Sequence, residues 1–224
     1  MKRARLMWLV LVTLAIATPA AWAQVGPVKQ QESKDAMTYF RLGVKHFKDN
    51  RYMEAVEAYK QAIRLKPDFA GAYHNLGYVY DELGWYKEGL ESYKRAIQLT
   101  PRDARMYSNM AVTYRKMGRY KEAVAACKQA ISLRPDLAEA HNNLGVAYYK
   151  MGRSREAIES YKQAISLKPD YAEAYFNLGV VYLAIKKKDA ALEQHTMLKS
   201  LNQQLAGEFF NVIYKDKVLS VSPK

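Results

Sequence analysis

The sequence predicts an all-α solenoid of about five helix-turn-helix repeats followed by a capping helix, and three observations lead to this fold class. First, residues of the same kind recur with a period of 34 along the chain of 224 residues. Second, within each half of a repeat the apolar and small residues fall three or four apart, the period of an amphipathic helix. Third, half of the residues are apolar and a quarter are charged, a balance typical of proteins that bury a core.

Residues 1–23 are expected to form a secretory signal peptide. Basic residues near the start precede an apolar run from Leu6, and Ala21-Trp22-Ala23 has the small-x-small pattern of a cleavage site. An uncleaved membrane anchor is the alternative, although the uncharged stretch contains Pro19 and its 18 residues are near the lower limit for spanning a membrane. Cleavage predicts an exported chain, soluble in the periplasm or cell envelope, without a transmembrane segment. Residues 24–35 are expected to be a flexible tether.

Five repeats are expected to follow, each beginning with an alanine: residues 36–69, 70–103, 104–137, 138–171 and 172–202. Residues suited to ending a helix mark the turn between the two helices of a repeat, namely Asp49-Asn50, Gly84, Gly118 and Gly152. Four repeats close on a proline: Pro67, Pro101, Pro135 and Pro169. Asp136 and Asp170, each followed three residues later by glutamate, predict aspartate N-caps in capping boxes.

Matching positions in the two helices of each repeat predict close packing between them. The first helix has a small residue at one position: Gly43, Gly77, Ala111, Gly145 and Gly179. The second helix has an aromatic residue or its replacement: Tyr59, Tyr93, Cys127, Tyr161 and His195. Without bulk at the small position the two backbones can approach. Cys127, the lone cysteine, excludes a disulfide within the chain and is expected to be a buried small hydrophobe.

The fifth repeat departs from the pattern. It has Lys186-Lys187-Lys188 where the turn glycine is expected, Leu198 at a position that is alanine elsewhere, and no closing proline. After it, apolar side chains on one helical face predict a capping helix over residues 203–216, and residues 217–224 are expected to be a loose tail.

The order of these residues resembles the tetratricopeptide repeat family, whose 34-residue unit places an aromatic residue, a Leu-Gly pair, a tyrosine, an alanine, an aromatic residue, an alanine and a proline in this sequence. The resemblance extends from Ala36 to the end of the fifth repeat. It implies a right-handed superhelical solenoid, in which the first helices line a concave groove that usually holds a peptide or a partner's helix.

The resemblance also implies which residues face that groove. One row consists of Phe40, His74, Ser108, Asn142 and Phe176. The next residue in each repeat gives Arg41 and then an asparagine ladder of Asn75, Asn109, Asn143 and Asn177. One turn further lie Val44, Tyr78, Val112, Val146 and Val180, and the expected rim residues are Arg105, Glu139 and Glu173.

The asparagine ladder has two interpretations. A side-chain amide can pair with the N–H and the C=O of a peptide backbone whatever the peptide's side chains are. At a helix spacing of about 10 Å and about 3.3 Å per extended residue, four asparagines would span about ten residues of a bound segment. Alternatively, the amides bond to neighbouring helices of their own fold.

The residues argue against a chaperone-tail clamp, one of the family's binding modes. In the family's pattern that clamp needs a lysine and an asparagine on one first helix, an asparagine on the next, and a lysine and an arginine on the third. The corresponding residues are Phe40, Val44, Asn75, Arg105 and Asn109, of which only two are compatible.

The chain carries a formal net charge of +13, and loss of the signal peptide with its three basic residues would leave +10. Because the lysines and arginines recur at matching points of each repeat, they predict a solvated outer face and not a nucleic-acid patch. Weak association with an anionic envelope surface remains open.

No catalytic pattern stands out in the sequence. The four histidines lack metal-ligand spacing, the glycines form no phosphate loop, and no pair of carboxylates is distinguished as acid and base. We therefore expect no enzymatic activity, no cofactor and no metal. The leading hypothesis is an exported scaffold that binds an extended or helical protein segment in its groove. The alternative is a self-assembling or envelope-associated structural factor that uses its basic convex surface and C-terminus.

Overall fold

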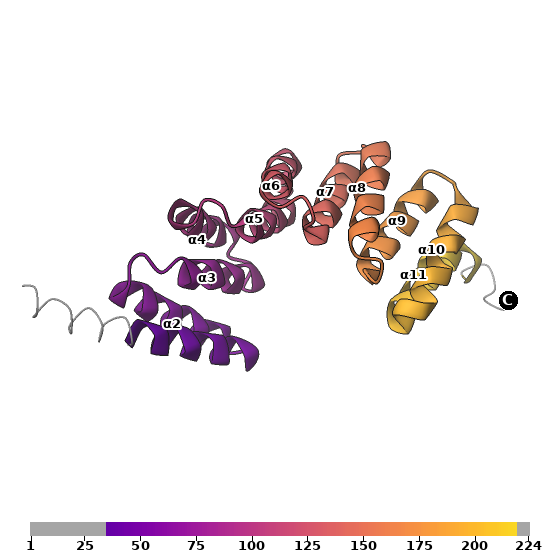
Figure 1. Ribbon diagram of the computed structural model, residues 1–224. Coiled ribbons are helices and arrows are strands. Elements are labelled where there is room, and N and C mark those ends of the chain that lie inside the picture. The colour runs from indigo at the N-terminus through magenta and orange to yellow at the C-terminus, as the bar shows by residue number, and fades with distance from the viewer. Residues whose placement is uncertain (1–34, 219–224) are drawn as a thin grey trace, which may run out of the picture.

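The computed structural model describes residues 35–218, and within this range every regular element is a helix (Figure 1). The expected signal peptide, residues 24–34 of the expected tether and residues 219–224 of the expected tail lie outside the described residues. None of the helices between residues 35 and 218 is both long and apolar enough to cross a membrane.

The helices follow one another in pairs. Residues 35–48 are helical and precede α2 (Tyr52–Leu65), α3 (Ala70–Glu82), α4 (Tyr86–Leu99), α5 (Ala104–Lys116), α6 (Tyr120–Leu133), α7 (Ala138–Lys150), α8 (Ser154–Leu167), α9 (Ala172–Ala184), α10 (Lys188–Leu201) and α11 (Gln203–Val218). Helices α3 and α4, α5 and α6, α7 and α8, and α9 and α10 pack as pairs, and each pair stacks on the next. The predicted solenoid of helix-turn-helix repeats is confirmed.

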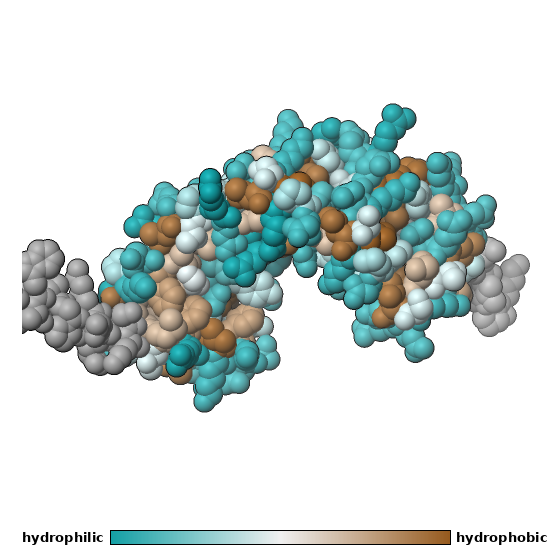
Figure 2. Space-filling model, viewed as in Figure 1, coloured by the Kyte–Doolittle hydropathy of each residue, from teal (hydrophilic) through white to brown (hydrophobic). Residues whose placement is uncertain are grey.

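The stack curves, with the first helix of each pair on the inner side. Helix α5 contacts both α3 and α7, and α7 also contacts α9, whereas α4, α6, α8 and α10 do not contact one another. Elements on the inside of a curve come closer than those on the outside, so the first helices line the concave face. The result is an arch (Figure 1), and the hollow beneath its middle is visible in the space-filling view (Figure 2).

The turn within each repeat uses one left-handed residue. Gly84, Gly118 and Gly152 have φ values of 76°, 72° and 75°. Asn50 and Lys186 adopt the same conformation at the matching positions, with φ values of 57° and 60°. Glycine and asparagine tolerate this region, but a lysine does so only against the steric preference of its Cβ.

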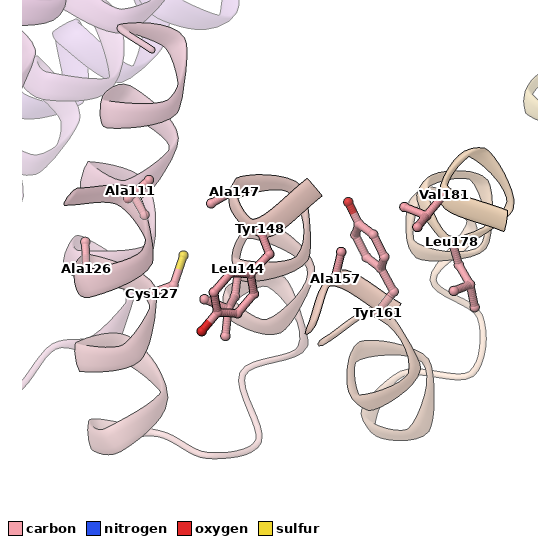
Figure 3. Close-up of a cluster of buried hydrophobic side chains, with 11 residues drawn as sticks. Ala111, Ala126, Cys127, Leu144, Ala147, Tyr148, Ala157, Tyr161, Leu178 and Val181 are labelled. Atoms are coloured by element: carbon pink, nitrogen blue, oxygen red, sulfur yellow. The ribbon is translucent and has the colours of Figure 1, made fainter. Parts of the chain in front are cut away.

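The predicted close packing within repeats is confirmed by the glycine positions. A Cβ built on Gly43 would lie 2.6 Å from a ring carbon of Tyr59, and one on Gly77 would lie 2.9 Å from a ring carbon of Tyr93. In the third repeat Ala111 and the fully buried Cys127 stand at these positions, so a larger residue on one helix is matched by a smaller one on the other. Ala111 and Cys127 belong to a cluster of buried side chains that extends to Tyr161, Leu178 and Val181 (Figure 3).

Helix α11 closes the C-terminal end of the stack by packing on α9 and α10. Its Phe209 is fully buried and lies against Gly179, whereas the first, second and fourth repeats pack their own tyrosine against the matching glycine. The fifth repeat has His195 at the position of that tyrosine, and the imidazole packs 6.4 Å from the Phe209 ring, measured between centroids. Helix α11 continues to Val218, two residues beyond the expected end of the capping helix.

The predicted aspartate caps are wrong. Helices α7 and α9 are capped by Leu137 and Tyr171, and neither cap residue makes a side-chain hydrogen bond to the helix. Leu137 is buried against the preceding repeat, so packing places the cap one residue after the aspartate. Among the caps of α2–α10, only Asp103 accepts a hydrogen bond through its side chain, from the backbone N–H of Arg105.

Near the start of α7, His141 stands where other repeats have tyrosine, and it keeps the tyrosine's hydrogen bond to a proline carbonyl oxygen. The Tyr107 and Tyr175 hydroxyls donate to the carbonyl oxygens of Pro101 and Pro169, over 3.4 Å and 3.2 Å. In the fourth repeat, the His141 Nε2 lies 2.9 Å from the carbonyl oxygen of Pro135. Either side chain therefore ties a first helix to the proline that closes the repeat before it.

Candidate peptide-binding groove

Two cavities on the concave side contain most of the predicted groove residues. The larger, here called the C-terminal cavity, has a volume of about 510 Å³. It includes the predicted Asn142, Asn143, Val146, Phe176 and Asn177. The smaller, the central cavity, has a volume of about 260 Å³ and includes the predicted His74, Arg105 and Asn109. These eight side chains come from α3, α5, α7 and α9, so the stacking of repeats brings distant residues to one face.

Ser108 and Glu139 also line the central cavity, and Glu173 and Val180 line the C-terminal cavity. The remaining six predicted residues line neither cavity: Phe40, Arg41, Val44, Asn75, Tyr78 and Val112. Phe40 packs in the core of the first repeat, with its ring 4.9 Å from Phe69 and 5.7 Å from Tyr59 between centroids. Tyr78 is 43% exposed and meets Phe47 edge-on at 5.3 Å. Val112 and Asn75 are half-buried. The predicted residues of the first repeat therefore lie outside both cavities.

Each asparagine of the ladder is tied to its own fold through the amide nitrogen. The Asn75 amide donates to the Tyr59 hydroxyl over 3.2 Å. Tyr59 lies on the second helix of the preceding repeat, whereas the other three amides reach the first helix of the preceding repeat. Their donor–acceptor pairs are Asn109 to His74 Nε2 at 2.8 Å, Asn143 to Ser108 Oγ at 3.2 Å, and Asn177 to Asn142 Oδ1 at 3.0 Å. These bonds join neighbouring first helices along the groove.

His74 has a single tautomer compatible with its two partners. Because the Asn109 amide donates to Nε2, the proton lies on Nδ1, which is 3.2 Å from Asn75 Oδ1 and donates to it. Burial lowers the pKa of His74, so the ring is held neutral. The result is a chain of hydrogen bonds from Asn109 through His74 and Asn75 to Tyr59.

The amide oxygens of the ladder differ from the amide nitrogens in their hydrogen bonding. In the described part of the chain, Oδ1 of Asn109, Asn143 and Asn177 accepts no hydrogen bond, and none of these atoms is buried without a partner. Each of these oxygens therefore keeps some accessible surface, and its residue lines one of the two cavities. The bonds to the neighbouring helix fix each amide in orientation and leave its oxygen free to accept.

Two predicted groove residues, Arg105 at the rim and Asn142 in the first row, already have partners within the fold. Arg105 forms a two-point ion pair with Asp103, with the shorter N···O distance at 2.8 Å. This pair holds the pKa of Asp103 below its ordinary value. Asn142 is mostly buried and supplies the acceptor for Asn177, so it supports the ladder as well as lining the C-terminal cavity.

Several cavity residues were missed in the sequence. Arg115, Tyr149 and Lys150 line the C-terminal cavity and stand three or four residues after the valine row on α5 and α7. Continuing the same helical face by one turn would have found them. Leu205 comes from α11, and no repeat pattern places it there. Tyr171 precedes α9 and also lines this cavity, and burial raises its pKa to about 12.

Between residues 35 and 214, no group of three or more His, Cys, Asp or Glu side chains could hold a metal.

A curved stack of helix pairs with a lined inner face defines a helical-repeat protein. The chain belongs to the tetratricopeptide repeat family. Family models described as tetratricopeptide repeat match residues 70–103, 102–170 and 147–195, and one described as TPR repeat matches residues 43–84. These matches run without a gap from residue 43 to residue 195, and the fold supports a scaffold for protein–protein interaction.

Solved structures of similar proteins agree with this assignment. The chain is similar to MamA, with 27% identity and a TM-score of 0.64 over 74% of this chain and 96% of that one. It is also similar to a thermophilic TPR protein of Thermus thermophilus, with 25% identity and a TM-score of 0.67 over 79% and 97% of the two chains. YrrB, described as a TPR protein with an unusual peptide-binding site, shares the fold at 22% identity, with a TM-score of 0.60 over 83% and 96%. No curated protein matched the sequence.

Proposed function

We propose that this protein is an exported, non-catalytic scaffold that binds an extended segment of another protein along its concave groove. The observation that carries the proposal is the hydrogen bonding of the asparagine amides in the ladder. Each amide is oriented by one bond to its own fold, while the oxygens of Asn109, Asn143 and Asn177 accept no hydrogen bond from the described residues and keep some accessible surface. Acceptors held at repeat intervals suit a peptide backbone, because its N–H groups are present whatever the side chains.

The cavities supply the rest of the contact. Val146 and Phe176 add apolar surface in the C-terminal cavity, and about ten extended residues would span the ladder. Preformed hydrogen-bond acceptors reduce the entropy lost on binding, since the amides are already ordered by the neighbouring helix. Export is proposed from the sequence pattern of residues 1–23 alone.

A peptide-display library of about ten-residue segments tests this function. We expect the purified protein to select peptides, and the double variant Asn109→Ala, Asn143→Ala to bind the selected peptides at least about tenfold more weakly. Asn211→Ala, which removes an exposed amide of α11, is the matched control. Thermal unfolding is measured for each variant. Unchanged binding with a lowered melting temperature would show that the ladder is structural only.

A second candidate function is self-assembly through the C-terminus. Helix α11 exposes Phe210 and Val212 at 46% and 44%, beside a cavity of about 550 Å³ that contains His195. Removing residues 203–224 would also remove the buried Phe209, so Phe210→Ser is the sharper variant. Light scattering that shows a concentration-dependent oligomer in the parent and a monomer in Phe210→Ser would support assembly. A monomer at every concentration would rule against it.

A further inference from the structure

The C-terminal cavity contains a cation without a counter-ion. The Arg115 Nε is buried and has no hydrogen-bond partner, and within residues 35–214 the guanidinium forms no salt bridge. Its positive charge acts on the Cys127 thiol and the Tyr161 hydroxyl, both neutral because burial raises the pKa of each. Burial raises the pKa of Cys127 to about 12, and the positive charge of Arg115 only partly opposes this rise. A partly desolvated charge without a partner destabilises the folded chain.

In the repeat before that of Arg115, the two acidic side chains at the end of α3 interact with other residues and not with Arg115. Asp81 holds the matching position on α3, and its Oδ2 accepts a hydrogen bond from the Thr113 hydroxyl at 2.6 Å. The residue after Arg115, Lys116, lies 3.8 Å from Glu82 Oε1 and donates to the Asp81 carbonyl over 3.3 Å. Asp81 Oδ2 and Glu82 are therefore engaged by Thr113 and Lys116, while Asp81 Oδ1 is buried without a hydrogen-bond partner. Arg115 pairs with neither carboxylate and lines the cavity.

A second free cation lines the same cavity. Lys150 stands on α7, one repeat beyond Arg115, and its ammonium forms no ion pair with the described carboxylates. Glu173 is the one acidic residue that lines this cavity, and it is exposed and pairs with neither cation. The cavity therefore combines two unpaired positive charges with the amides of Asn143 and Asn177.

We infer that the C-terminal cavity binds the carboxylate of an aspartate or glutamate side chain in the extended protein segment, with Arg115 as its main contact and Lys150 as the second. This inference rests on the proposed function, because the same segment lies along the asparagine ladder. The cations come from α5 and α7, whereas Phe176 and Asn177 on α9 continue the groove beyond them. A segment that fills the cavity therefore passes the cations in mid-run, which favours a side-chain carboxylate over a chain terminus.

The display library described above also tests the partner's chemistry, using Arg115→Gln with Arg155→Gln as the matched control. Arg155 is an exposed residue of α8 outside the cavity, and its replacement removes the same charge. We expect the parent and Arg155→Gln to enrich Asp or Glu at one peptide position. Arg115→Gln should lose this enrichment and bind the selected acidic peptides about tenfold or more weakly.

Each other outcome has a distinct meaning. Peptides selected without an acidic preference would overturn the inference and leave the groove function intact, whereas no selection by the parent would overturn both. Selected peptides are then resynthesised with an amidated C-terminus, and binding that requires the free terminus would overturn the side-chain assignment.

A stability measurement separates binding from structure. Because Arg115 is unpaired, Arg115→Gln should leave the melting temperature unchanged or raise it, and a clear decrease would show that the guanidinium supports the fold. If Arg115→Gln does not fold, Lys150→Gln serves as the second variant. Its affinity for the acidic peptides should fall severalfold, and an unchanged affinity would overturn the inference.

Discussion

The phenol ring of Tyr161 occupies the space that a side chain on Gly145 would fill. A Cβ built on Gly145 would lie 2.7 Å from Cε1 of Tyr161, closer than carbon atoms approach without a shift. Gly145→Ala should therefore lower the free energy of unfolding by about 1–3 kcal/mol, since overpacking displaces the ring or the helix. Chemical denaturation measures the change. Gly207→Ala, at a helical glycine with open space around it, is the control and should be neutral or stabilising.

The third repeat indicates how the overpacking can be relieved. Ala111 and Cys127 stand where the fourth repeat has Gly145 and Tyr161, and both are buried. Adding Tyr161→Cys to Gly145→Ala should therefore remove the clash, although it also removes the buried ring. The two changes should couple by about 1 kcal/mol or more in a double-mutant cycle. Strict additivity would show that the ring and the glycine do not constrain each other.

Lys186 is the strained turn residue of the fifth repeat. Its φ of 60° matches the turn glycines of the other repeats, but its Cβ makes this conformation unfavourable by about 1–2 kcal/mol. Lys186→Gly should raise the melting temperature, as followed by circular dichroism. Lys187→Gly removes the same charge at a residue with φ of −92° and should give no such gain. Equal effects of the two substitutions would assign the change to charge and not to backbone strain.

Phe209 holds α11 on the end of the solenoid. Because its ring is fully buried against Gly179, Phe209→Ala should destabilise the protein by about 3–5 kcal/mol. Hydrogen exchange should show the loss first in α9, α10 and α11, since repeats transmit stability mainly to their neighbours. Phe210→Ala is the control, as this neighbouring ring is 46% exposed. A similar loss in both variants would contradict the capping role of Phe209.

His74 makes stability depend on pH. Burial lowers the pKa of this histidine below its ordinary value of 6.5, so the unfolded chain binds the proton more readily than the folded one. Its contribution to stability is present above the unfolded pKa and is lost as the pH falls below that value. The free energy of unfolding, measured from about pH 8 to about pH 5, should decrease less in His74→Gln than in the parent. His141→Gln controls for loss of an imidazole elsewhere, and identical slopes for the parent and His74→Gln would refute this account.

Much of the groove could be predicted because repeat phase assigns residues to a face. His74, Asn109, Asn143 and Asn177 lie on the concave side as their positions in the repeat require. The phase does not predict how deep each place is. Phe40 is packed by Phe69, and Arg105 is paired with Asp103, because neighbours outside the row decide what a side chain contacts.

Exceptions to the repeat pattern have local physical causes that the structure shows. The second helix of the second repeat has Gly89 where most repeats have alanine, and a Cβ there would lie 2.9 Å from the Asp81 carboxylate. The buried carboxylate therefore requires a residue without a Cβ at position 89. From the sequence alone, Gly89 is only a small residue at a small position.

The sequence by itself determined the all-α repeat, the helix pairs, the turn residues and the face on which the asparagines lie, because these follow from the period of a helix and from the steric limits of glycine and tyrosine. The tertiary structure decided which amide atoms are bonded, which cavity residues converge and which charge is left unpaired. Those features depend on distances between repeats, as between Asn177 and Asn142, or on a segment outside the pattern, as with Leu205 of α11. Periodicity specifies direction along one helix, whereas contact between helices is set by how the whole stack closes.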